Sequence, residues 1–215
     1  MEIVESFFSV GDRAHGLLES REVAACWDRP SALAEYSVGG LAGHLLRATG
    51  RTEQLVGGPE PAGAEVVELA AFFGANRIRE PTDLDSDFQR AVRDDGERAG
   101  GIGPEALADS FGQLLARLRA MLPGVAPDRL VPVLTIPGAA TTFENYMRSR
   151  VVELIVHTDD LAVSVGVAPP EPGSRPASVA IGALVELARA RSGDLGVIRG
   201  LARAERARPD DLRAL

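Results

Sequence analysis

Glu153 and His157 are the residues of this sequence best suited to act together. They are four apart in residues 146–165, whose pattern predicts a helix, so their side chains should lie one turn above each other and reach one ion. Further polar residues fall within about 60° of Glu153 on the helical wheel: Tyr146, Ser149, Arg150, Asp160 and Ser164. Aliphatic residues border this polar stripe on both sides, so we expect it to face the interior, with Arg148 and Asp159 facing water.

A buried Glu153 needs a partner, because an unpaired buried carboxylate either costs free energy or shifts its pKa until it is neutral. A divalent cation would serve as that partner. An ion pair with Arg150, one turn earlier, is the alternative. Both possibilities are compatible with the pattern of the stripe.

The chain has three histidines, His15, His44 and His157, so a histidine-rich metal site must draw on these. His44 is predicted at the inward edge of a second helix, whereas His15 is expected to be a surface histidine or a hydrogen-bonded one. His44, Glu153 and His157 would leave one coordination position open to water or substrate, which is the pattern of a catalytic zinc site.

Arg150 and Asp160 are the candidate catalytic residues beside these ligands. Asp160 could orient a ligand histidine or form an ordinary interhelical hydrogen bond. Arg150 could receive a substrate carboxylate or orient Glu153. Trp27 and Tyr36 are expected to be packing residues.

The elements that must position these side chains are helical, and the class predicted is all-α. Low aromatic content (5%) and much Ala and Leu favour helix. Helices are expected at 2–25, 38–56, 64–79, 87–98, 104–122, 146–165, 177–191 and 193–207. Residues 123–142 hold four prolines, and VPVLTIPG there predicts a short strand or hairpin. Gly39, Gly40 and Gly43 indicate either close packing or a frayed helix start.

Composition excludes several classes of protein. The 215 residues suit one domain or one domain with an appendage, and the net charge is -8, with the basic residues scattered among acids, so nucleic acid is not an expected partner. One cysteine excludes an internal disulfide. No apolar run approaches the ~20 residues that span a membrane, and acids stand where a signal peptide is basic. A cytoplasmic location is expected.

Two blocks of the sequence resemble the mycothiol-dependent maleylpyruvate isomerase family, part of the wider DinB-like group of metal-binding four-helix bundles. The first, WDRPSALAEYSVGGLAGHLLRA, ends near His44, which matches the family's ligand histidine. The second, RSRVVELIVHTDDLAVSVG, carries Glu153 and His157 in a Glu-x-x-x-His segment followed by Asp-Leu-Ala. The chain departs from the family at Asp159, where a tryptophan is common.

The resemblance implies a DinB-like bundle over residues 1–166 and a helical extension over 167–215. It also implies a divalent metal, zinc, on His44, Glu153 and His157, with mycothiol or a similar low-molecular-weight thiol as cosubstrate. The thiolate would attack an electrophilic small molecule, either in S-transfer or in thiol-assisted isomerisation. The family's isomerase carries a further C-terminal domain that contributes to its active site, so maleylpyruvate itself is not the expected substrate.

Two other functions remain open at this point. The chain could be a non-catalytic bundle that binds a metal or a partner, or a hydrolase that uses metal-bound hydroxide and needs no thiol. A monomer and a homodimer are both compatible with the sequence.

Overall fold

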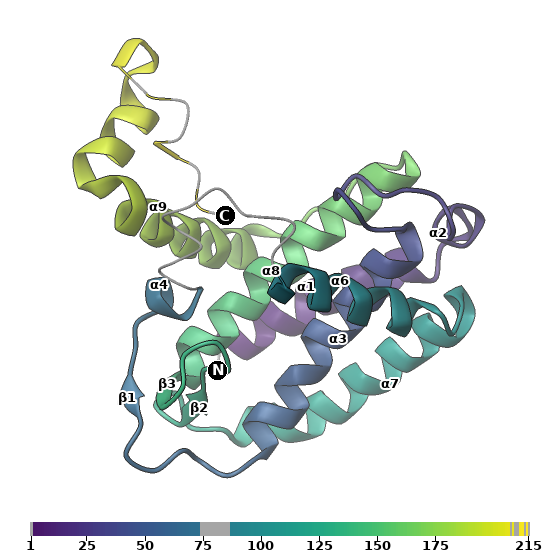
Figure 1. Ribbon diagram of the computed structural model, residues 1–215, viewed down its shortest axis with the longest axis horizontal. Coiled ribbons are helices and arrows are strands. Elements are labelled where there is room, and N and C mark those ends of the chain that lie inside the picture. Colours follow the sequence, from purple (N-terminus) through teal and green to yellow (C-terminus); the bar gives the residue numbers. More distant parts are fainter. Residues whose placement is uncertain (1, 74–86, 207, 209–210, 213, 215) are drawn as a thin grey trace.

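The computed structural model describes residues 2–73, 87–206, 208, 211–212 and 214, and it is predominantly helical (Figure 1). The helices are α1 (Glu2–Leu18), α2 (Arg21–Ala25), α3 (Val38–Gly57), α4 (Leu69–Phe72), α6 (Asp87–Gly100), α7 (Pro104–Met121), α8 (Phe143–Val165) and α9 (Ser174–Ala202), with 3-10 turns η1 (Leu122–Gly124) and η2 (Ala204–Arg206). This arrangement confirms the all-α, DinB-like bundle and its small β element.

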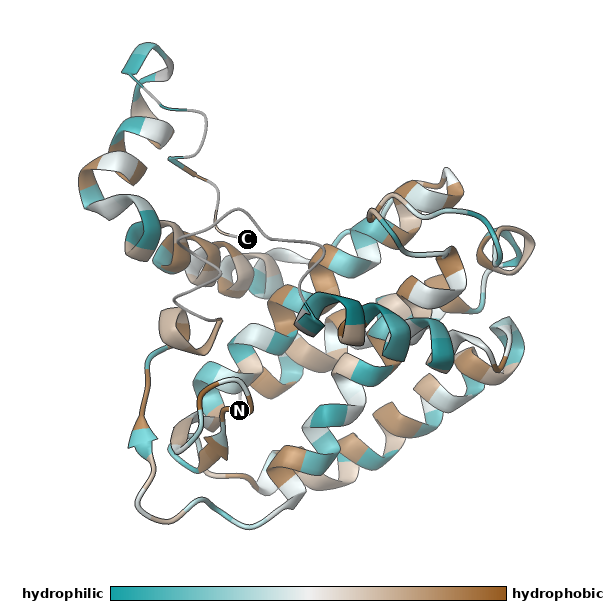
Figure 2. Cartoon of the chain, in the orientation of Figure 1, coloured by the Kyte–Doolittle hydropathy of each residue, from teal (hydrophilic) through white to brown (hydrophobic). Residues whose placement is uncertain are grey.

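Four long helices, α1, α3, α7 and α8, surround one hydrophobic core. Each contributes side chains with no exposed surface: Phe7 from α1, Leu41 from α3, Phe111 and Leu118 from α7, and Met147 from α8. The apolar faces of the helices point toward one another and the polar faces toward solvent (Figure 2). Burial of these faces is what holds α3 and α8 side by side.

Side-chain caps fix where the two site-bearing helices begin. The Ser37 side chain accepts a hydrogen bond from the Gly40 N–H at the start of α3, as its position in the sequence predicts. Thr142 caps α8 in the same way, so this helix begins at Phe143, earlier than the predicted Tyr146. Gly166 ends α8 in the left-handed conformation that glycine favours.

A small sheet covers one end of the bundle. Strands β2 (Leu130–Pro132) and β3 (Ala139–Thr142) pair antiparallel, which confirms the predicted hairpin within residues 123–142. Strand β1 (Glu65–Val66) adds to β3 in parallel and gives the order β1-β3-β2. The helix predicted over 64–79 is therefore wrong at its start, and residues 74–79 lie outside the described chain.

The first predicted helix is also wrong, because residues 2–25 form two helices. α1 ends at Leu18, and Ser20 caps α2 by accepting a hydrogen bond from the Val23 N–H. The hydrophobic spacing continues across the break, which is why periodicity alone did not reveal it. The capping residue Ser20 marks the start of α2, which the spacing of apolar residues does not indicate.

Helix α9 joins the two predicted terminal helices through a break at Gly193, whose φ of 73° and ψ of 164° are not helical. Its first half packs on α8, where Ala180 and Ala183 belong to the same buried hydrophobic cluster as Val152. Arg148, which was predicted to face water, instead pairs with Glu186 of α9 at 2.7 Å. The second half of α9 turns away from the bundle (Figure 1).

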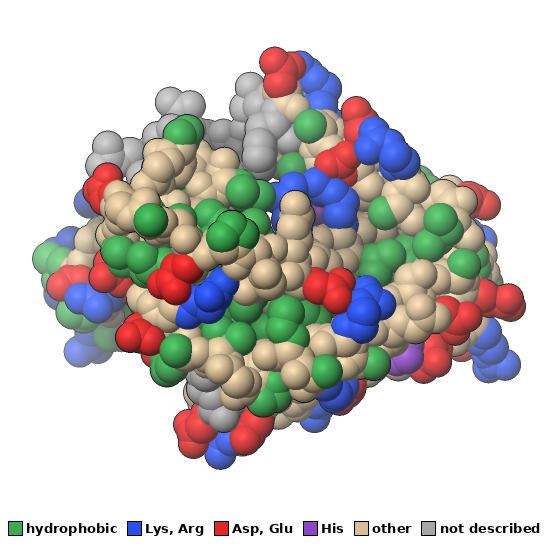
Figure 3. Space-filling view, turned by 90° about the horizontal axis from the view of Figure 1, so that it is seen from below, with side chains coloured by type: hydrophobic (Ala, Val, Ile, Leu, Met, Phe, Trp, Pro, Cys, Tyr) green, Lys and Arg blue, Asp and Glu red, His purple; other side chains and the backbone are tan. Residues whose placement is uncertain are grey.

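The surface carries charges of both signs. On the face shown in Figure 3, acidic and basic side chains are interspersed, with hydrophobic side chains between them. Among the described residues, no helix is both long enough and apolar enough to cross a membrane.

Candidate metal centre

The three predicted ligands come together where α3 crosses α8. His44 extends from α3, and Glu153 and His157 extend from successive turns of α8. Oε2 of Glu153 lies 3.8 Å from Nε2 of His44 and 3.5 Å from Nε2 of His157. The two imidazole rings are nearly perpendicular, with centroids 4.8 Å apart. One ligand atom from each residue lies within 4.8 Å of the other two, so the group could hold a metal ion.

The polar stripe of α8 faces inward as its neighbours predict. Tyr146 and Ser149 are fully buried, and the side chains of Glu153 and His157 are 24% and 17% exposed. His44 is 14% exposed. These three candidate ligands therefore lie in a partly desolvated environment with limited access from solvent. Asp159, where the family commonly has a tryptophan, is exposed.

Asp160 contacts the face of His157 opposite Glu153. Its Oδ2 lies 3.0 Å from Nδ1 of His157. A carboxylate can only accept, so Nδ1 is the donor, and Nε2 is the nitrogen directed at Glu153. The loop before α3 closes this end, because Ser164 Oγ accepts from the Ala32 N–H and donates to the Asp160 carbonyl.

The charges of the centre are strongly coupled. Burial acts to raise the pKa of Glu153, but hydrogen bonds with His157 and His44 and the charge of Arg150 outweigh it and hold the pKa well below its usual value. Burial acts to lower the pKa of His157, but hydrogen bonds with Asp160 and Glu153 raise the pKa to about 9. Burial lowers the pKa of His44. Without a metal, one imidazolium therefore neutralises Glu153.

Arg150 does not form the ion pair with Glu153 that was the alternative to a metal. Its Nε donates to Ser149 Oγ at 3.2 Å, one Nη donates to the Ala48 carbonyl at 3.5 Å, and the guanidinium lies over the Tyr146 ring. Within the described residues, no carboxylate lies within 4.0 Å of it. It acts on Glu153 only through its charge.

A seam of glycines places α6 directly on α3 beside His44. A Cβ added at Gly43 would overlap the Gly96 carbonyl oxygen, and one at Gly100 would overlap the Gly39 carbonyl oxygen. Close packing, rather than a frayed start, therefore explains the glycines of α3. The backbone of α6 thus forms one wall next to the His44 side chain.

Two residues near His44 were not identified as functional from the sequence. The buried Tyr36 ring lies edge-on to the His44 ring, with the two ring centroids 5.9 Å apart. Tyr36 is therefore both a packing residue and a neighbour of the centre. Glu97 of α6 accepts hydrogen bonds from the Ser37 N–H at 2.8 Å and from Ser37 Oγ at 2.7 Å, which fixes the start of α3. Local spacing gives no signal for Glu97, because its partner is 60 residues away.

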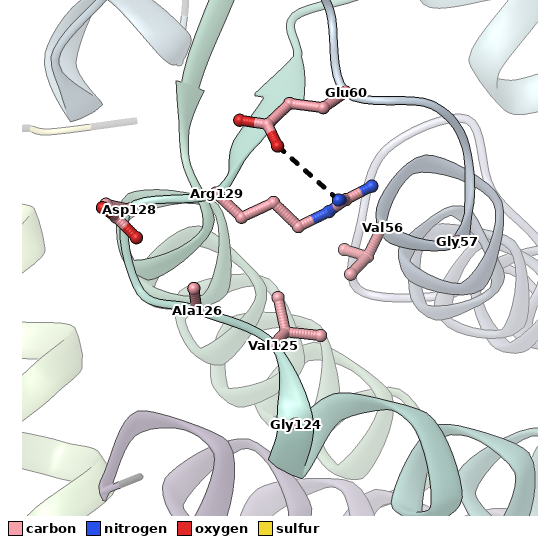
Figure 4. Close-up of a pocket in the computed structure, with 8 residues that line it drawn as sticks. All are labelled: Val56, Gly57, Glu60, Gly124, Val125, Ala126, Asp128 and Arg129. Carbon is pink, nitrogen blue, oxygen red and sulfur yellow. Dashed lines mark ion pairs between the residues drawn. The ribbon is translucent and has the colours of Figure 1, made fainter.

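Two hollows differ in their relation to this centre. A cavity of about 10 Å³, near the minimum that a water molecule needs, lies beside the ligands and is lined by Leu45, Ala48, Thr49, Arg150, Glu153, Leu154 and His157. A larger hollow of about 590 Å³ lies at the other end of α3, next to Val56 and Gly57. There Arg129 extends across the opening toward Glu60, 3.8 Å away (Figure 4). The larger hollow does not include the ligands.

His15 lies apart from the centre, as expected. Its Nε2 is 3.1 Å from the Ala108 carbonyl oxygen of α7, and its ring stacks on Phe111. It is a hydrogen-bonded histidine in the packing between α1 and α7.

Comparison with known proteins identifies the family of this chain. No curated protein and no solved structure gives a significant match. The profile of the family described as the mycothiol maleylpyruvate isomerase N-terminal domain matches residues 9–162, a span that contains His44, Glu153 and His157. Because this span covers most of the chain, the protein belongs to the mycothiol maleylpyruvate isomerase N-terminal domain family.

Proposed function

We propose that the protein is a cytoplasmic, metal-dependent enzyme that uses a low-molecular-weight thiol, mycothiol or a close analogue, against an electrophilic small molecule. The ion, zinc, would be held by His44, Glu153 and His157. The observation that carries the proposal is the convergence of one possible ligand atom from each of these three partly buried residues, within 4.8 Å of one another and from two different helices.

The residues present fit a divalent cation. The Glu153 carboxylate has two imidazoles against it and no arginine within ion-pairing distance in the described structure. Two neutral imidazoles and one carboxylate form a donor set typical of catalytic zinc, with one position left open. When bound, such a cation lowers the pKa of a coordinated thiol, so that a thiolate is available as the nucleophile.

Each residue of the chain then has a distinct task. Asp160 holds the proton on Nδ1 of His157 and so keeps the Nε2 lone pair available as a ligand. Arg150 has guanidinium N–H groups beyond the two that donate to Ser149 and Ala48, and these would receive an anionic group of the substrate. The surrounding aliphatic residues limit the access of water.

The chemistry follows from the thiol. The thiol releases its proton to solvent, and its sulfur forms a bond to an electrophilic carbon. At the same time the π bond of the substrate breaks and its electron pair moves to the neighbouring atoms, or the bond to a leaving group breaks and that group departs with the electron pair. In an S-transfer this C–S bond remains in the product. In a thiol-assisted isomerisation, addition to a conjugated double bond allows rotation about the former double bond, and cleavage of the C–S bond then restores both the double bond and the thiol.

The chain organisation that accompanies this proposal is a bundle over 1–166 and a helical extension over 167–215. The buried hydrophobic cluster that Ala180 and Ala183 share with Val152 supports an extension that packs on the bundle. The family match, which ends at residue 162, is compatible with the same boundary.

Metal content of the purified protein is the first test. Elemental analysis should find about one ion per chain in the wild type and much less in His44→Ala, Glu153→Ala and His157→Ala. His15→Ala is the matched control, because this histidine lies outside the centre, and it should retain the ion. Equal metal content in all variants would contradict the ligand set.

A second test separates the thiol enzyme from its rivals. In cobalt-substituted protein, excess thiol should produce a sulfur-to-cobalt absorption band, and a thiol-plus-electrophile panel should reveal turnover. Metal binding with no sulfur ligation would favour a non-catalytic bundle. Turnover that needs no thiol would favour metal-assisted hydrolysis.

A further inference from the structure

Tyr36 is held beside the metal centre by the loop that precedes α3. Its backbone N–H donates to the Leu33 carbonyl at 3.2 Å, and its carbonyl accepts from the Ser31 N–H at 2.8 Å. The preceding residue, Glu35, has a φ of 69°, in the left-handed region that residues with a side chain rarely adopt. Strained backbone of this kind is found most often where a structure positions a functional side chain. The Tyr36 side chain therefore extends from a backbone that hydrogen bonds fix on both sides.

The ring of Tyr36 packs against both α3 and α6. It lies edge-on to the His44 ring, at an interplanar angle of 71°, and only 9% of the residue is exposed. A Cβ added at Gly96 of α6 would lie 3.2 Å from Cε1 of Tyr36 and 3.4 Å from Cβ of His44. The same stretch of α6 backbone therefore supports both side chains and holds them against each other.

The hydroxyl group of Tyr36 has no hydrogen-bond partner among the residues that the structure describes. The other tyrosine of the chain, Tyr146, differs in this respect, because it is 1% exposed and its hydroxyl lies 3.4 Å from Oγ1 of Thr52. A tyrosine hydroxyl in a mostly buried position usually has a partner. The Tyr36 hydroxyl, next to a candidate ligand histidine, is therefore available to a molecule that enters the centre.

Charged side chains from three helices act on this hydroxyl. Burial raises the pKa of Tyr36, and the charges of Glu97 and Glu153 act in the same direction. The charges of Arg93 and Arg47 oppose this rise. The Tyr36 hydroxyl is thus within electrostatic reach of the carboxylate of Glu153, and as a neutral phenol it can donate a hydrogen bond.

We propose that the Tyr36 hydroxyl donates a hydrogen bond to the ligand in the open coordination position of the centre, which is the thiolate sulfur when the thiol is bound. The identity of this ligand rests on the proposed function, but the hydrogen bond would form equally to another anion in the same position. A hydrogen bond to an anion is stronger than one between neutral groups. The phenol keeps its proton throughout. Tyr36 is then a catalytic residue that contacts the cosubstrate, in addition to its packing against His44.

Cobalt-substituted protein tests the proposal with two probes of the open position, azide and 2-mercaptoethanol, each titrated through its charge-transfer absorption band. Tyr36→Phe removes only the hydroxyl and keeps the ring against His44. It should retain about one cobalt ion per chain and bind both probes about 10- to 100-fold more weakly than the wild type. Tyr146→Phe is the matched control, because the hydroxyl that it removes is buried with Thr52. It should bind both probes like the wild type, and circular dichroism should show that all three proteins are equally helical.

The two probes separate failure of this proposal from failure of the proposed function. Equal affinities of Tyr36→Phe and the wild type for every probe that binds would overturn the role of Tyr36 and leave the thiol function standing. If azide binds to the wild type and the thiol does not, the thiol function fails, and weaker azide binding by Tyr36→Phe would still support the hydrogen bond. Loss of cobalt from Tyr36→Phe, or a wild type that binds no cobalt, would overturn the proposal, because the hydroxyl would then not act on a ligand in the open position.

Discussion

Nδ1 of His157 lies 3.0 Å from Oδ2 of Asp160, one turn later on α8, while Nε2 of the same ring points to Glu153. This contact fixes both the tautomer and the orientation of the ring. Asp160→Ala should therefore lower the affinity for zinc by about 10- to 100-fold, which is typical for the loss of such a partner. A competition titration with a chromophoric chelator measures the effect. Asp159, the residue before Asp160, is exposed, so Asp159→Ala should leave the affinity for zinc unchanged.

Metal binding should release protons. The pKa of His157 is about 9 in the metal-free protein, so at pH 7.5 this ring is protonated and must lose a proton before Nε2 can bind an ion. The lowered pKa values of His44 and Glu153 leave both ready to bind. We expect about one proton per ion. Calorimetry in buffers of different ionisation enthalpy measures this number, and a heat independent of the buffer would contradict the coupling.

The metal-free protein should lose stability as the pH rises above neutrality. His157 binds its proton more tightly in the folded chain, with a pKa of about 9, than at its ordinary value of 6.5. Its contribution is complete below pH 6.5 and disappears as the pH rises to about 9. The loss should reach roughly 3 kcal/mol of unfolding free energy. Urea unfolding after chelation tests this, and His157→Gln should show a flatter dependence on pH.

Two glycine-to-alanine substitutions in α3 should change the stability of the fold in opposite directions. Gly43→Ala should destabilise the fold by about 1–3 kcal/mol, because the new methyl group meets the Gly96 carbonyl oxygen and the two backbones must separate. Gly50→Ala, also in α3, meets only Leu114 Cδ2 at 3.8 Å and should stabilise by up to about 1 kcal/mol. Chemical denaturation measures both. If Gly43→Ala and Gly50→Ala destabilised the protein equally, the close packing of the α6 backbone on α3 would be contradicted.

Much of the bundle could be predicted from the sequence because its signals are local. The inward polar stripe of α8 follows from the order of residues on one helix, and the start of α3 follows from Ser37. The convergence of His44 with Glu153 and His157 could be expected because these three candidate ligands lie in the two blocks that resemble the family.

What could not be predicted depends on partners distant in the chain. Glu97 binds Ser37, and Arg148 finds Glu186, through contacts that no local pattern encodes. Strand β1 exists because β3 offers it backbone hydrogen bonds, although the apolar spacing of residues 64–79 favours helix. In β1 the tertiary context outweighed the local helix propensity.

Helix α9 bends at Gly193. A backbone with φ of 73° and ψ of 164° is essentially restricted to the one amino acid without a stereocentre. The exposed apolar residues Leu195, Ile198 and Leu201 therefore follow a bend that is made at a single achiral residue. A side chain at this position would be strained in the observed conformation, and its strain would favour another direction for the residues that follow.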